Sequence, residues 1–173
     1  MIILEPPQGH FFELLNKIKS ITNKKSNSMK DIVRATRFAW KKALLLDKID
    51  MECSKMRSIE RTKGQTDRIY NSILQQIHDI RHEEEIDAFK IKISEAFSDI
   101  HIIRDKAPVK VGIVGEIYTV LEPFVNLNIE KQLGELGVEV SRSIYITDWV
   151  RENLLPSFLK PKDHKKMLEL ARP

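Results

Sequence analysis

Four polar side chains, close together in the chain, are the strongest candidates for chemistry. They are Glu116, Tyr118, Glu122 and Asn126, and they follow the apolar segment 109–114. That segment has the nearly continuous apolar character of a strand in a parallel sheet that is covered on both faces. Ligand sites in open α/β sheets form outside the carboxyl ends of such strands. A carboxylate there could act as an acid or base, and an asparagine amide could bond a ligand. We therefore predict that these four residues line a substrate cleft.

Each of these side chains also has a purely structural interpretation. Glu116 can accept hydrogen bonds from nearby backbone N–H groups, and Tyr118 can pack against the next strand. The charge of Glu122, next to Pro123, can simply favour a helix N-terminus. No catalytic role is assigned to any of them.

The elements that must position this cleft form a strand–helix–strand unit. The strand at 109–114 is followed by a helix whose first turn contains Pro123 and whose end is capped by Gly137. A second strand is expected at 138–140. The glycines in this unit do not have the spacing of a dinucleotide-binding loop, and no phosphate-binding loop is present. Beyond it, a short helix is expected to begin at residue 147 or 148 and run to 155, and a final helix spans 162–170.

Most of the remaining chain is predicted to be helical. A helix at 11–21 precedes a very long helix at 28–62, which Ser28 and Asp31 open with a variant of the capping box. Further helices cover 69–80 and 86–100, although no glycine or proline separates them and one continuous helix is also possible.

The predicted fold class is α/β, with few parallel strands in a Rossmann-like unit beside a large helical region. Residues 1–7 form an orphan strand and turn, residues 8–106 the helical region, and residues 107–173 the Rossmann-like α/β piece.

Charge is unevenly distributed along the 173 residues, whose net charge is +4. The segment 24–63 has 12 basic and 5 acidic residues, an excess of +7 from the difference of these two counts. A helix with this charge could dock an acidic protein partner, which makes a helical interaction module on 28–62 the alternative function. Nucleic acid is not an expected partner, because no nucleic-acid motif accompanies the basic helix and aromatic residues make up only 7% of the chain.

Cysteine and hydropathy set further bounds. Cys53 is the single cysteine, so no internal disulfide forms and one thiol cannot by itself hold a metal or an iron–sulfur cluster. His78 and His82 have the i, i+4 spacing of zinc ligands, but no third ligand follows at a telling distance. No apolar run approaches the length that spans a bilayer, and Met1–Leu4 is not a signal peptide. We expect no membrane partner and a cytoplasmic location.

The strand–helix–strand unit resembles a known family. The segments 111–118 (VGIVGEIY) and 121–126 (LEPFVN), continued by Arg142–Tyr145 and Asp148–Trp149, are similar to 2-hydroxyacyl-CoA dehydratase-related proteins and to activase-related proteins of such CoA enzymes. The likeness covers about 75 residues of the chain.

This resemblance implies a longer parent protein, in which two Rossmann-like lobes hold a [4Fe-4S] cluster used in acyl-CoA dehydration. No residue of this chain matches a cluster ligand, so we expect no cofactor here and a cluster only in the parent. The chain is then an interior fragment that contributes to a cluster or acyl-CoA cleft and is not catalytic alone. Expected partners are the rest of the parent, or a dehydratase or activase protein.

A homodimer is a further expectation. The predicted sheet is too small to close on itself, and unpaired strand edges invite pairing with another chain. The long amphipathic helix is also more than one small core can cover.

Overall fold

The computed structural model describes residues 28–103, 105 and 107–153. The orphan strand expected at 1–7 and the helices expected at 11–21 and 162–170 lie outside these residues. The chain divides into two compact units, one made of residues 1–34 and 148–173 and the other of residues 35–147. The elements in chain order are α2 (Met29–Ile59), α3 (Gln65–Asp79), α4 (Glu84–Ser98), β1 (Val109–Ile113), α5 (Ile117–Leu121), α6 (Ile129–Glu135), β2 (Val138–Arg142) and α7 (Ile146–Asn153).

The long helix α2 begins as its sequence predicts. The Ser28 N–H donates to Asp31 Oδ2 at 3.1 Å, and the Lys30 N–H donates to Ser28 Oγ at 3.4 Å. These bonds satisfy donors that an α-helix leaves unpaired in its first turn. The helix runs for 31 residues, close to the predicted 28–62.

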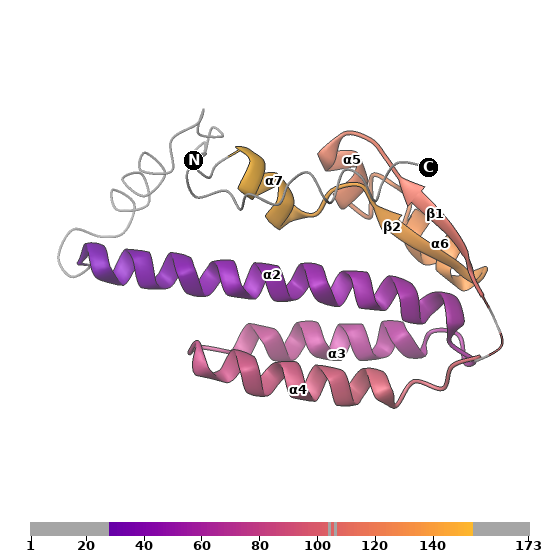
Figure 1. Cartoon of the computed structure of the whole chain (residues 1–173), viewed down its shortest axis with the longest axis horizontal. Helices are drawn as coiled ribbons and strands as arrows, with labels where there is room; N and C mark the ends of the chain where they lie inside the picture. Colours follow the sequence, from indigo (N-terminus) through magenta and orange to yellow (C-terminus); the bar gives the residue numbers. More distant parts are fainter. Residues whose placement is uncertain (1–27, 104, 106, 154–173) are drawn as a thin grey trace. The chain divides into compact units, whose positions relative to one another are not determined.

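One face of α2 packs on α3 and α4 to make the apolar core (Figure 1). Isoleucines and phenylalanines at helical spacing supply most of this core, as expected for three amphipathic helices. Its buried members are Leu45, Ile49, Cys53, Ile73, Ile77, Ile80, Ile86, Phe89, Ile93, Phe97 and Ile100.

Helices α3 and α4 are separate, so the alternative of one continuous helix is wrong. The helix α3 ends at Ile80, whose backbone is extended, with ψ of 121°. The Glu85 carboxylate then accepts hydrogen bonds from the Arg81 and His82 N–H groups at 2.8 and 3.1 Å. The turn between the two helices is therefore held by a polar side chain from the first turn of α4, without glycine or proline.

A buried carboxylate organises the turn between α2 and α3. Glu60 is 1% exposed, and its two oxygens accept hydrogen bonds from the Gly64 and Thr66 N–H groups at 2.8 and 2.7 Å. Gly64 has a φ of 82°, a left-handed conformation that favours glycine. Glu60, the residue that follows the end of α2, therefore caps the first turn of α3.

The two strands form a parallel pair, with Val109 opposite Val138 and Ile113 opposite Arg142. Both strands lie where the sequence predicts them, which confirms a mixed α/β fold that is mostly helical. The prediction of a strand covered on both faces is wrong for β1, since four of its five residues are exposed. The reason is that α6 packs against β2, and among the described residues β2 is the single strand that pairs with β1.

The connection between the strands differs from the single helix expected from Pro123 to Gly137. A five-residue helix α5 comes first, and Pro123 lies in the turns that follow it. Leu127 and Asn128 both have left-handed backbones, with φ of 57° and 56°, so a helix cannot pass through them. Gly137, with φ of 85°, ends α6 as predicted.

Candidate functional site

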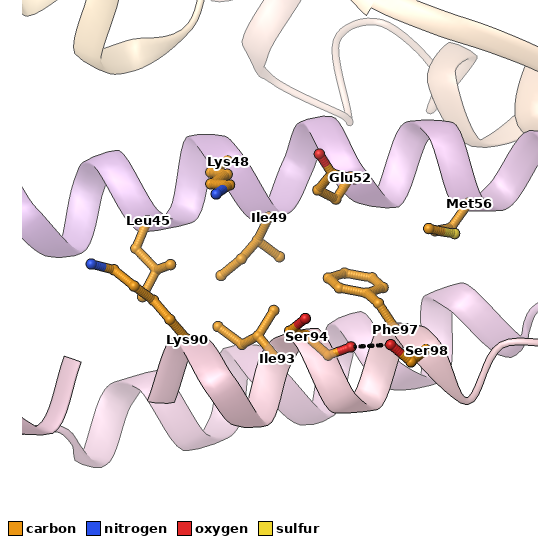
Figure 2. A pocket seen from close by; sticks show the side chains of 10 residues that line it. All are labelled: Leu45, Lys48, Ile49, Glu52, Met56, Lys90, Ile93, Ser94, Phe97 and Ser98. Atoms are coloured by element: carbon orange, nitrogen blue, oxygen red, sulfur yellow. Dashed lines mark hydrogen bonds between the residues drawn. The ribbon is translucent and has the colours of Figure 1, made fainter. Parts of the chain in front are cut away.

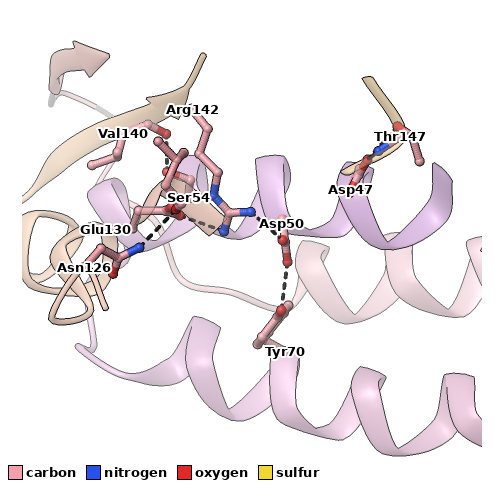
Figure 3. A network of polar contacts seen from close by, with 10 residues as sticks. Asp47, Asp50, Ser54, Tyr70, Asn126, Glu130, Val140, Arg142 and Thr147 are labelled. Carbon is pink, nitrogen blue, oxygen red and sulfur yellow. Dashed lines mark hydrogen bonds and ion pairs between the residues drawn. The ribbon is translucent and has the colours of Figure 1, made fainter. Parts of the chain in front are cut away.

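A stripe of polar side chains runs along α2 on the face turned to β2 and to the start of α7. Asp47, Asp50, Ser54 and Arg57 have the 3- and 4-residue spacing that places side chains on one side of a helix. Asp47 Oδ2 accepts from the Thr147 N–H at 2.9 Å, and Ser54 Oγ donates to the Val140 carbonyl (Figure 3). The β2 strand is therefore attached to α2 through polar contacts.

Arg142, the last residue of β2, is the centre of this network. Its Nη2 lies 3.0 Å from Glu130 Oε2 of α6, and its Nη1 lies 3.0 Å from Asp50 Oδ2 of α2. Burial alone would favour the neutral guanidine, but the hydrogen bonds and charges of Glu130 and Asp50 outweigh it and raise the pKa of Arg142 above its ordinary value. Arg142 is a permanent cation that joins α2, α6 and β2 (Figure 3).

Tyr70 extends the network to α3. Its hydroxyl donates to Asp50 Oδ1 at 2.7 Å. Burial and the negative charge of Asp50 raise the pKa of Tyr70, so the phenol stays protonated and remains a donor.

A second group of ion pairs joins α2, α3 and α6 on the other side of the network. Arg57 Nη2 lies 2.7 Å from Asp67 Oδ1, and Lys131 Nζ lies 3.4 Å from Asp67 Oδ2. Burial alone would raise the pKa of Asp67, but the hydrogen bond from Arg57 and the charges of Arg57 and Lys131 hold it below its usual value. The carboxylate is ionised at neutral pH.

These residues line a cavity of about 230 Å³ at the carboxyl end of β2. Its charged lining has Asp50, Asp67 and Glu130 against Arg57, Lys131 and Arg142, so the formal charges cancel. The wall also contains four uncharged hydrogen-bonding side chains, Tyr70, Asn71, Asn126 and Asn128, and three less polar residues, Cys53, Leu121 and Pro123. Because the acids and bases are paired with one another, the cavity is suited to hydrogen bonding and to binding by shape, and no nucleophile and base stand poised together among its lining residues.

A larger groove, of about 360 Å³, lies between α2 and α4 (Figure 2). Its floor is formed by the core side chains Ile49, Ile93 and Phe97, with Lys48 and Lys90 at its rim. The groove has few polar groups that converge, so the cavity beside β2 is the better candidate site.

Of the four predicted cleft residues, the structure places only Asn126 at this cavity. Its amide Nδ2 donates to the Val120 carbonyl at 3.0 Å, which fixes the side chain beside Glu130 (Figure 3). Glu116 caps α5 instead, accepting from the Tyr118 and Thr119 N–H groups at 2.9 and 3.2 Å.

The other two predicted residues lie on the surface or in a turn. Tyr118 is 63% exposed, and Glu122 Oε1 accepts from the Phe124 N–H at 3.2 Å. The structure therefore does not bring Glu116, Tyr118 and Glu122 together with Asn126 around one cavity.

Sequence reasoning missed the charged residues of the cavity. Asp50 and Arg57 belong to a helix rich in charge, where polar side chains at helical spacing are also typical of a solvated face. Arg142 offered a usable signal, since it lies two residues after the predicted strand at 138–140, at the carboxyl end of a sheet.

The basic helix uses several of its charges internally. Arg37 and Lys41 both pair with Glu83, and Lys42 Nζ donates to the Ile80 carbonyl at 3.2 Å. These cations attach α2 to the α3–α4 turn. They are therefore less available to an acidic partner than the composition of 28–62 suggests.

The residues of this chain do not fit an iron–sulfur cluster, which is held by several cysteine thiolates. Cys53 is the single cysteine and lies buried in α2, where burial raises the pKa of its thiol to about 12. Within the described ranges no three His, Cys, Asp or Glu side chains are grouped so that they could hold a metal ion. Across those same ranges, none of the helices has the length and apolar character to cross a membrane.

Comparison with known proteins gives no family assignment. No protein-family model matches the chain, and neither the curated proteins nor the solved structures contain a match.

Proposed function

We propose that this chain is the cleft-forming region of an iron–sulfur-associated protein of the 2-hydroxyacyl-CoA dehydratase-like or activase-related class, with a Rossmann-like α/β piece that binds part of an acyl-CoA ligand. The chain alone binds this part of the acyl-CoA ligand but does not catalyse a reaction of it. The observation that carries the proposal is the cavity at the carboxyl end of β2, with Asn126 in its wall. Asn126 belongs to the segment 121–126 on which the resemblance to that class rests.

The chemistry of the cavity supports binding without turnover. Its acids and bases neutralise one another, Tyr70 stays protonated, and the pKa of the Cys53 thiol is raised to about 12. A group that transfers a proton at neutral pH needs a pKa near neutrality, and a nucleophilic thiol needs a lowered one. The neutral amides of Asn71, Asn126 and Asn128 would instead bond the polar groups of a ligand.

The first experiment measures binding of acetyl-CoA to the 173-residue chain by calorimetry. The variant Asn126→Ala should weaken binding roughly tenfold, because it removes one amide hydrogen bond from the cavity wall. The matched control is Tyr118→Ala, which changes another predicted cleft residue that is exposed and should leave affinity unchanged. Circular dichroism checks that both variants fold.

A loss of binding that is equal in both variants, or no acetyl-CoA binding by the wild-type chain, would overturn the acyl-CoA assignment. The iron–sulfur association is tested separately on the complete gene product that contains this sequence. When it is purified without oxygen it should contain iron and acid-labile sulfide, and a preparation with neither would contradict the proposed class.

A further inference from the structure

In the part of the chain that the structure describes, the strand β1 has an open edge. β2 occupies one side of it, as shown by the 2.9 Å bond from the Ser143 N–H to the Ile113 carbonyl. Backbone groups alternate in direction along a strand, so those of Val109, Val111 and Ile113 point to β2. Those of Lys110 and Gly112 therefore point away from it, toward the free edge.

Within residues 28–103, 105 and 107–153, no strand pairs along this edge. Val109 is 69% exposed, and Val114, just beyond the strand, is 84% exposed. A Cβ built on Gly112 would meet nothing within 4 Å. Free edges of this kind accept a further strand unless the sequence blocks it.

We propose that a second copy of this chain pairs with β1 along this edge, in an antiparallel arrangement whose two-fold axis passes beside Val111. The sequence Val109–Ile113 is self-complementary in that register. Val111 stands opposite Val111 of the second copy, and Val109 opposite Ile113, so the apolar side chains share one face.

Charge supports the same register. Lys110 is the one charged residue of β1, and it stands opposite Gly112 of the second copy, which has no side chain to obstruct it. Its ammonium keeps its present partner, since Lys110 Nζ lies 3.4 Å from Glu139 Oε1 on the neighbouring strand β2. No like charges face each other across the axis, and such an opposition is what disfavours self-pairing of most edge strands.

The backbone groups match as well. Lys110 and Gly112 exchange both of their hydrogen bonds with Gly112 and Lys110 of the second copy. One step further out, the Val114 N–H reaches the carbonyl of Pro108 of the second copy. Pro108 has no N–H, so the ladder ends there. The result is a four-stranded sheet in the order β2–β1–β1–β2.

The register can be tested by disulfide cross-linking between two copies of the chain. In a Cys53→Ser background, the variant Val111→Cys places two thiols opposite each other at a non-hydrogen-bonded pair, where Cα atoms lie about 4.5 Å apart. It should cross-link to a dimer under mild oxidation. The matched control, Val109→Cys, is offset by four residues from its counterpart, about 13 Å along the strand, and should not cross-link.

Light scattering of the wild-type chain gives the second readout. It should show a mass near twice 20.2 kDa at micromolar concentration. Gly112→Pro removes an edge N–H without touching the bonds to β2, and should weaken dimerisation roughly tenfold or more. Gly112→Ala keeps that N–H and should remain dimeric.

Two results would overturn the proposal. A monomeric wild-type mass would show that two copies of this chain do not pair along the β1 edge. Equal cross-linking of Val109→Cys and Val111→Cys would exclude this register. Neither result affects the acetyl-CoA measurement, so the failure of one proposal is distinguishable from the failure of the other.

Discussion

Asp67 shows how one side chain can tie stability to pH. Its pKa is lowered in the folded protein because it binds Arg57 and Lys131. A carboxyl group whose pKa is lowered by folding stabilises the folded state at pH values above its unfolded-state pKa. This stabilisation is lost as the pH falls through the folded-state pKa. The Arg57–Asp67 pair is therefore expected to lose strength in acid, below about pH 4.

We predict that Asp67→Asn reduces the loss of unfolding free energy that the wild type shows when the pH falls from neutral to below about 4. Urea titrations at a series of pH values measure this. The control is Asp79→Asn on the same helix, where the carboxylate is 83% exposed, and it should keep the wild-type slope. A wild-type slope in Asp67→Asn would show that this pair does not couple folding to protons.

Cys53 is the opposite case, because burial keeps its thiol protonated at neutral pH. Burial raises the pKa of its thiol to about 12, against which the nearby positive charge of Arg57 acts only in part. Since the thiolate is the reactive form, iodoacetamide should label the native chain at pH 8 far more slowly than the chain in urea. Mass spectrometry over time measures both rates, and comparable rates would mean that the thiol is accessible in the folded protein.

At the scale of elements, α6 can lie close to α2 because residue 134 of α6 is a glycine. A Cβ added at Gly134 would meet Arg57 Cδ at 2.5 Å and Arg57 Cγ at 2.8 Å. Arg57 cannot simply swing away, because its guanidinium is bound to Asp67. The close approach of the two helices therefore depends on glycine.

We predict that Gly134→Ala lowers the free energy of unfolding by about 1–3 kcal/mol, the usual cost of overpacking. Gly112→Ala is the matched control, since open space surrounds that position and the change should be nearly neutral. Chemical denaturation of both variants provides the comparison. Equal stability of the two would show that α6 shifts away from Arg57 at little cost.

At the scale of the whole molecule, the core and the cavity belong to the same unit. All buried members of the core cluster, from Leu45 to Ile100, lie within residues 35–147, and so do the residues that line the cavity. This unit also contains the hydrogen bond that the Thr147 N–H donates to the Asp47 carboxylate.

We predict that a chain of residues 35–147 folds cooperatively and keeps the helical circular dichroism of that unit, because no member of the core cluster is removed, although the buried Ile32 is lost. Thermal unfolding followed by circular dichroism at 222 nm measures this, and the expected result is one transition that coincides with the transition seen by tryptophan fluorescence. A broad, non-cooperative transition would show that residues 1–34 and 148–173 contribute to its stability.

Local sequence patterns predicted several elements correctly. Ser28 with Asp31 opens α2, the apolar segment at 109–113 is a strand, and Gly137 ends a helix, because caps, alternation and glycine conformation are decided by neighbouring residues. The break between α3 and α4 was left open, since it depends on Glu85 folding back to Arg81 and His82. The left-handed pair Leu127–Asn128, which interrupts the expected helix, gave no comparable signal.

The candidate site was decided by tertiary structure. By itself the sequence determined where the two parallel strands lie, and of the four residues predicted to line a cleft after the first strand, Asn126 lies in the wall of the cavity beside β2. It could not select Asp50, Glu130 and Arg142, which are separated by up to 92 residues and meet only when α6 and β2 pack on α2. The sequence does not show whether a charged side chain is solvated or buried in an ion pair, because the packing of distant elements decides between the two.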